Sequence, residues 1–67
     1  MDDREDHLTF PDVELLEDSG YTVVCRIEGK PVTLPVVFIL PGSTVWRRGD
    51  RGTLVIPRRV AGDLGLI

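Results

Sequence analysis

Apolar and polar side chains alternate most clearly along residues 21–28. Every second position there is apolar, namely Tyr21, Val23, Cys25 and Ile27. A period of two is typical of a strand with one buried face. The pattern of residues 12–18 fits a strand or a helix, but the turn cluster Asp18-Ser19-Gly20 favours a strand. The two segments are therefore predicted to form a β-hairpin.

The remaining apolar positions predict shorter elements. A strand is expected over residues 32–34, and it should be interrupted at Pro35, because proline cannot donate to a strand ladder. Residues 36–40 are apolar and would form either a helical turn or a short strand. Two more strands are expected over residues 44–47 and 53–56, with a glycine-containing tight turn between them.

The end of the sequence has the pattern of a short helix. Pro57 ends the last strand and suits the first turn of a helix over residues 58–64. The spacing of Val60, Ala61 and Leu64 places them on one face, which should pack on the sheet. Gly65 is placed for a left-handed cap, and Leu66 for the apolar contact that accompanies it.

These elements predict a mainly β fold. We expect a small antiparallel curled sheet, or a partly open SH3-like barrel, of four or five strands with a short C-terminal helix, because closure removes exposed edges. Residues 1–8 are nearly devoid of apolar side chains and are expected to form a disordered acidic leader. Residues 9–67 would then form a single small β domain.

Charge is distributed unevenly along the 67 residues. The first 18 carry eight acids and one base, whereas the remaining 49 carry three acids and seven bases. The acidic segment could be a solubilising tail, a counter-charge for the basic part, or a strip that binds a partner. Five arginines follow Trp46 between residues 47 and 59. They could bind the phosphates of a nucleic acid or form the rim of a protein interface.

Residues that could support catalysis or metal binding are few. The single cysteine, Cys25, lies in an apolar run and is predicted to be a buried hydrophobe; without a partner it also indicates a reducing, cytoplasmic compartment. The only histidine, His7, lies in the acidic segment, and Ser19 and Ser43 lie beside turn glycines. We therefore expect no enzyme, metal or cofactor, and no apolar stretch long enough for a membrane span.

The segment 49–66 reads Gly-Asp-Arg-Gly-Thr-Leu-Val-Ile-Pro-Arg-Arg-Val-Ala-Gly-Asp-Leu-Gly-Leu. It resembles the signature of AbrB-type regulators and MazE-type antitoxins, which have a glycine, a short apolar strand, Ile-Pro, a basic residue, a brief helix and a Leu-Gly pair. The resemblance implies a dimer whose interleaved hairpins present arginines to DNA. The matching positions are Arg51, Arg58 and Arg59, with Arg47 and Arg48 nearby. The order of elements over the whole chain is also similar to that of small accessory proteins of phages and plasmids.

These observations lead to two functional hypotheses. We expect a non-enzymatic module that acts by protein–protein contact, as a phage or mobile-element accessory protein such as an inhibitor of a host defence or regulatory complex. The alternative is a homodimeric DNA-binding regulator or antitoxin of the AbrB/MazE type; a structural subunit of a larger assembly is the third. The expected partner-binding residues are Trp46, Arg47, Arg48, Arg51, Arg58 and Arg59.

Overall fold

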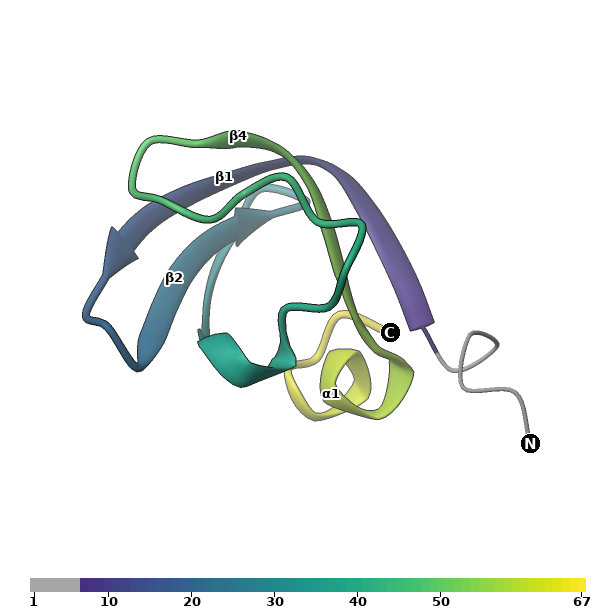
Figure 1. The fold of residues 1–67 in the computed structure, drawn as a ribbon. Coiled ribbons are helices and arrows are strands. Elements are labelled where there is room, and N and C mark those ends of the chain that lie inside the picture. The colour runs from purple at the N-terminus through teal and green to yellow at the C-terminus, as the bar shows by residue number, and fades with distance from the viewer. Residues whose placement is uncertain (1–6) are drawn as a thin grey trace.

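A computed structural model describes residues 7–67 as one antiparallel sheet with a short helix (Figure 1). The strands follow the spatial order β3-β2-β1-β4, so that the long first strand is central. The elements are β1 (His7–Asp18), β2 (Thr22–Ile27), β3 (Lys30–Pro35), the 3₁₀ turn η2 (Val36–Phe38), β4 (Arg51–Pro57) and α1 (Arg58–Asp63).

The mainly β architecture with a C-terminal helix is confirmed, but the sheet is open and uncurled, not a curled sheet or a partly open barrel. It has four strands, and β3 and β4 are edges that do not pair with each other. The predicted strand over residues 44–47 is a loop, so residues 7–67 form no fifth strand. Residues 36–40, for which two conformations were open, begin with the 3₁₀ turn.

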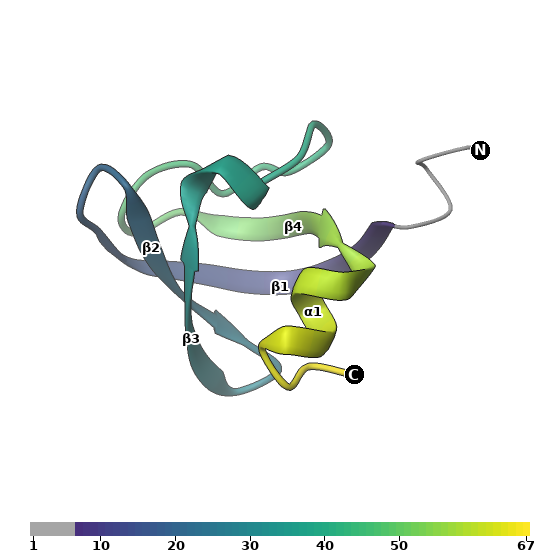
Figure 2. The same ribbon diagram turned by 90° about the horizontal axis from the view of Figure 1, so that it is seen from below.

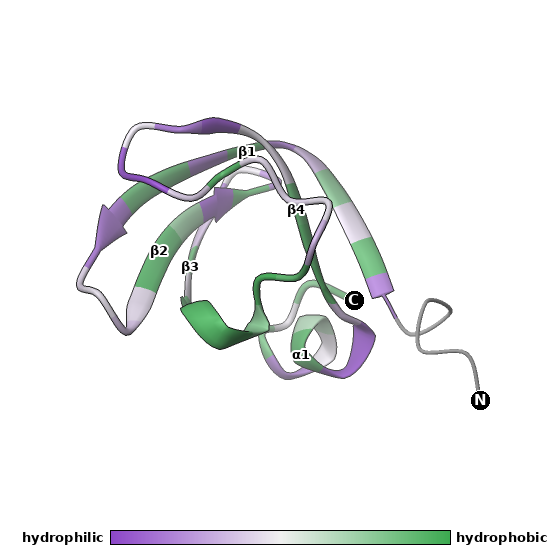
Figure 3. Ribbon diagram, viewed as in Figure 1, coloured by the Kyte–Doolittle hydropathy of each residue, from purple (hydrophilic) through white to green (hydrophobic). Residues whose placement is uncertain are grey.

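One face of the sheet carries the core. The apolar alternation of β2 is confirmed at Val23, Cys25 and Ile27, all of which are buried. The prediction was wrong for Tyr21, whose side chain is 85% exposed, because β2 begins one residue later and Tyr21 belongs to the turn. Figure 3 shows the resulting alternation of apolar and polar residues along β1 and β2.

The first strand is longer than the sequence pattern predicted. Most of the predicted leader, residues 1–6, lies outside the described residues. The last two residues of that segment, His7 and Leu8, belong to β1 and pair with Pro57 and Ile56 of β4. The central strand therefore begins before the predicted domain boundary at residue 9.

The pairing of β1 with each of its two neighbouring strands contains one register shift. Its register with β4 shifts between Phe10 and Val13, where Asp12 has a positive φ of 56°, and its register with β2 shifts between Leu15 and Glu17. Bulges bend a strand and increase its twist, and aspartate tolerates the left-handed region better than most residues. The strand accordingly bends along its length (Figure 1).

The helix ends as the sequence predicted. Gly65 has φ 78°, its N–H donates to the Gly62 carbonyl at 3.1 Å, and the Leu66 N–H donates to the Ala61 carbonyl at 2.9 Å. This pair of bonds is a Schellman motif. Val60 and Ala61 are buried, and α1 packs against β4 and β1 (Figure 2).

The outer edge of β4 is covered by residues 40–44, here called the strap. Its bonds to Thr53 and Val55 satisfy the backbone groups of β4 that point away from β1. The bonds are Leu40 N–H to Val55 O at 2.9 Å, Val55 N–H to Ser43 Oγ at 2.8 Å, Thr44 N–H to Thr53 O at 2.8 Å and Thr53 N–H to Thr44 Oγ1 at 2.9 Å. Side-chain hydroxyls thus accept where a partner strand would offer carbonyls, and this is why no regular strand forms here.

The outer edge of β3 is protected by two prolines. Glu28 and Gly29, which join β2 to β3, both have positive φ, as in the type I′ turn of a two-residue hairpin. At the other end of β3 the Val36 N–H donates to the Tyr21 carbonyl at 2.9 Å. In an antiparallel pair, every second residue of β3 directs its backbone N–H and C=O groups away from β2. These outward residues are Pro31, Thr33 and Pro35. Only Thr33 among them has an N–H that an added strand could use.

Gly52 is required where the strap crosses β4. A Cβ at this position would clash with Thr44 Oγ1. We expect Gly52→Ala to destabilise the fold by about 1–3 kcal/mol, the usual cost of overpacking. Urea denaturation measures the change. The matched control is Gly62→Ala in α1, whose Cβ meets only Ile67 Cγ1 at 4.0 Å. This control should gain roughly 0.5–1 kcal/mol, and an equal response of both variants would contradict the steric argument.

Opening the β3 edge should promote self-association. The double variant Pro31→Thr, Pro35→Thr adds two outward N–H groups beside that of Thr33, and residue 35 already has an extended conformation with φ −65° and ψ 140°. We expect oligomers that increase with concentration, measured by gel filtration with light scattering. Pro41→Thr, at an exposed proline in a turn, is the control. An unchanged mass for the double variant would show that the prolines do not protect this edge.

Candidate partner-binding surface

Trp46 lies in the loop of residues 46–50, here called the Trp46 loop, between the strap and β4. Its neighbour Val45 is fully buried and anchors the start of the loop in the core. The Trp46 side chain is 51% exposed, and its indole Nε1–H donates to the Ser43 carbonyl at 3.0 Å. The ring is therefore held against the strap by its polar end and presents apolar surface to solvent.

Asp50 closes the Trp46 loop. Its Oδ2 accepts hydrogen bonds from the backbone N–H groups of Trp46 and Arg47, both at 2.9 Å, and its own N–H donates to the Arg47 carbonyl at 2.9 Å. The two bonds to the carboxylate, aided by the nearby Arg47 charge, lower the pKa of Asp50 below its usual 3.8. One carboxylate thus fixes the backbone on both sides of the Trp46 peptide.

The base of the loop is fixed to the central strand. The Gly49 N–H donates to the Leu15 carbonyl at 2.8 Å, and the Leu15 N–H donates to the Asp50 carbonyl at 2.9 Å. These bonds extend the β1–β4 ladder beyond its last regular pair, Glu14 and Arg51. Because Leu15 is fully buried, the loop is attached to the central strand at a residue of the core.

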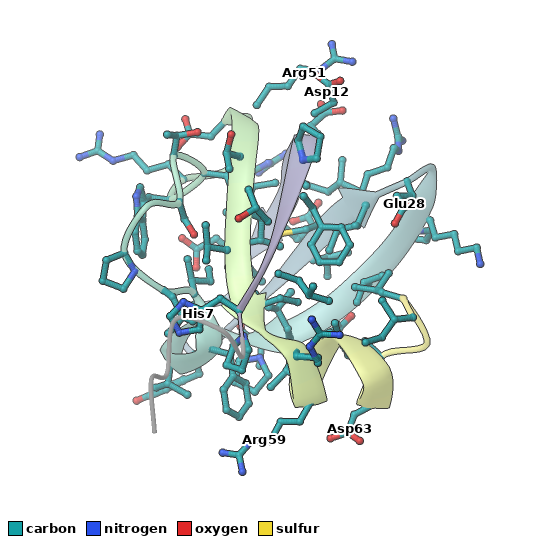
Figure 4. All side chains as sticks on the ribbon, turned by 90° about the vertical axis from the view of Figure 1, so that its right-hand side faces the viewer. His7, Asp12, Glu28, Arg51, Arg59 and Asp63 are labelled. Carbon is teal, nitrogen blue, oxygen red and sulfur yellow. The ribbon has the colours of Figure 1, made fainter. Side chains whose placement is uncertain are left out.

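The structure divides the predicted partner-binding residues into two groups. Trp46, Arg47 and Arg48 are exposed in the loop, and the exposed Arg51 follows at the start of β4. The other two, Arg58 and Arg59, are exposed at the start of α1. The seven residues of β4 separate the groups by roughly 20 Å. Figure 4 shows Arg51 and Arg59 at opposite ends of the molecule, so the five arginines do not form a single patch.

Acidic side chains of β1 lie beside the arginine at the start of β4. Glu14 is the cross-strand partner of both Arg26 in β2 and Arg51 in β4, and its Oε1 lies 3.5 Å from Arg26 Nη1. Asp12 lies near Arg51 at the same end of the molecule (Figure 4). The surface around Arg51 is consequently of mixed charge.

The cysteine and the two serines considered for chemistry are buried or hydrogen-bonded to the protein. Cys25 is buried, and burial raises the pKa of its thiol to about 11, so that the thiolate is disfavoured at neutral pH. The hydroxyl of Ser43 bonds to β4 within the strap, and that of Ser19 bonds within the β1–β2 turn. Within residues 7–67 no cluster of three or more potential metal ligands occurs. No helix there has the length and apolarity needed to cross a membrane.

One contributor to this surface, the Asp50 carboxylate, was not predicted from the sequence. Asp50 was assigned only to a tight turn, although an aspartate four residues after Trp46 and just before a strand can accept from preceding N–H groups. The exposure of Tyr21 and Val37 was also missed. Their apolar character gave no signal, because isolated exposed hydrophobic residues are common on protein surfaces.

Comparisons with known proteins give no relative from which a function could be transferred. No protein-family model, curated protein or solved structure matches the chain significantly.

Protonating Asp50 should release the Trp46 loop. Because the folded state lowers this pKa, the carboxylate stabilises the loop fully above pH 3.8, and the effect is lost as the pH falls through the lower, folded-state pKa. The fluorescence of Trp46, the single tryptophan, should change in that acidic range, and Asp50→Ala should show the low-pH spectrum near neutral pH.

Asp63→Ala, at the end of α1, is the control and should keep the parent transition. Far-UV circular dichroism distinguishes release of the loop from unfolding of the sheet. A fluorescence spectrum of Asp50→Ala that equals the parent spectrum near neutral pH would refute the bracing role of this carboxylate.

Proposed function

We propose that this chain is a non-catalytic binding module that docks onto a protein partner through the Trp46 loop. The observation that carries the proposal is a half-exposed tryptophan whose backbone and indole N–H groups are both held by the protein itself. Tryptophan and arginine are the residue types most enriched among those that dominate interface energies, and Arg47 and Arg48 adjoin Trp46. A surface fixed before binding loses little conformational entropy when a partner docks.

The edges of the sheet favour docking by side chains over addition of a strand. The strap already occupies the hydrogen-bonding groups at the β4 edge, and Pro31 and Pro35 interrupt the β3 edge. An extended peptide would therefore find no continuous ladder to join. This geometry supports recognition through a projecting loop.

A module of this kind would act by covering a functional surface of its partner. Such a role suits an accessory protein of a phage or other mobile element that inhibits a host defence or regulatory complex, because complementary surface is the only requirement. The genes that neighbour its own would test this part of the proposal. Anti-defence or phage genes would support it, and an adjacent toxin gene would favour an antitoxin.

The DNA-binding alternative has one structural point in its favour. β4, Pro57, α1 and the Gly65 cap follow the order of strand, proline, helix and Leu-Gly pair on which the AbrB/MazE resemblance rests. The separation of the arginines into two groups, with acidic residues of β1 beside Arg51, weighs against a continuous DNA-binding surface. The protein-binding proposal is therefore the better supported one.

Removing the Trp46 side chain should abolish partner binding. With the immobilised protein as bait and nuclease-treated extract of the source organism as probe, we expect at least one protein that the parent retains and Trp46→Ala does not. Titration calorimetry with that protein should show a loss of about 2 kcal/mol or more, or about 30-fold in affinity.

Tyr21→Ala is the matched control, because Tyr21 is also an exposed aromatic residue but lies in the β1–β2 turn. It should bind as the parent does. Equal retention by Trp46→Ala and the parent would refute the proposal. Binding to random duplex DNA with an affinity that falls steeply with salt would favour the regulator instead.

A further inference from the structure

The hydrogen bonds of Trp46 determine what a partner must offer to its ring. The indole N–H is the only polar group of the side chain, and it already donates to the Ser43 carbonyl at 3.0 Å. A partner therefore need not supply an acceptor, and the exposed half of the ring offers only its apolar, aromatic surface. The complementary site for this side chain is an apolar pocket.

The charges of the loop determine the surroundings of that pocket. Arg47 and Arg48 follow Trp46 directly and are exposed, whereas the Asp50 carboxylate is directed at two backbone N–H groups. The surface that the loop presents beside the indole is consequently positive. Guanidinium groups match carboxylates in a two-pronged geometry, and such pairs fix the orientation of a docked partner.

The same geometry weighs against phosphates as the binding partner. A duplex presents charges continuously along its length, and a module that follows it needs a row of cations. Here Asp12 and Glu14 lie beside Arg51, and the next arginines, Arg58 and Arg59, lie at the far end of β4. A local cluster of carboxylates needs only the two arginines next to Trp46.

Resting on the proposed function, we infer that the Trp46 loop recognises a folded acidic protein at an apolar pocket rimmed by Asp or Glu side chains. The indole enters the pocket while Arg47 and Arg48 pair with carboxylates at its rim. Before contact, the Asp50 carboxylate holds the backbone of Trp46 and Arg47, and the Ser43 carbonyl holds the indole. The acidic rim speeds association by electrostatic steering, so that binding should weaken as salt rises.

Charge reversal within the loop tests this inference. The probe is again nuclease-treated extract of the source organism, and the baits are the parent, Trp46→Ala, the double variant Arg47→Glu, Arg48→Glu, and the matched double variant Arg58→Glu, Arg59→Glu. We expect the protein retained by the parent to be acidic and to be lost with the first double variant. The second double variant should retain it.

Titration of that purified protein gives the magnitude. We expect the reversal at Arg47 and Arg48 to weaken binding by about tenfold or more, and the parent affinity to fall by a similar factor between about 50 and about 300 mM NaCl. The neutral variant Arg47→Gln, Arg48→Gln should lie between the two. Parent-like Trp46 fluorescence in this neutral variant shows that the loop itself is intact, since Glu at position 47 would stand near the Asp50 charge.

The outcomes separate the two proposals. Binding that requires Trp46 but is unaffected by reversal at Arg47 and Arg48, or by salt, would overturn the acidic rim and leave the binding module standing. A basic retained protein would also overturn the acidic rim. Retention that does not depend on Trp46 would overturn the proposed function itself. Equal losses with both double variants, together with binding to random duplex DNA, would identify nucleic acid as the partner.

Discussion

The outward-facing backbone groups of β4 are the constraint on which the rest of this structure depends. An open four-stranded sheet has two edges, and the groups of Thr53 and Val55 would otherwise lack protein partners. The strap supplies those partners with two backbone N–H groups and the hydroxyls of Ser43 and Thr44. Because the Thr44 hydroxyl must reach β4 closely, the strand has a glycine at position 52.

The Trp46 loop follows from the same constraint. Once the strap is bonded to β4 and Val45 is buried, the chain must reverse within a few residues to enter β4 at Arg51. Asp50 closes that reversal, and the bonds to Leu15 attach it to the central strand. Protection of the edge and display of the tryptophan meet at Ser43, whose hydroxyl bonds to β4 and whose carbonyl accepts from the indole.

The sequence predicted the features that arise from local pattern and not those that arise from long-range hydrogen bonding. The alternation at Val23, Cys25 and Ile27 and the helix end at Gly65 and Leu66 are local signals, and both are confirmed. The expected strand over residues 44–47 was wrong because hydroxyl-to-backbone bonds across roughly ten residues have no periodicity. The open form of the sheet and the distance between the two arginine groups also depend on long-range strand pairing, so local pattern could not predict them.

A domain with so little interior can recognise a partner in few ways. Most of its buried side chains belong to one core beneath the sheet, which leaves no second layer to enclose a ligand. Its edges resist strand addition, and the one free thiol is buried and protonated at neutral pH. The proposed partner contact therefore rests on exposed side chains, and in the described residues the Trp46 loop combines an aromatic ring, adjacent arginines and a backbone held by hydrogen bonds. A surface of this kind gains its specificity from the rigidity of the backbone behind it, because neither an indole nor a guanidinium selects a partner unless its direction is fixed.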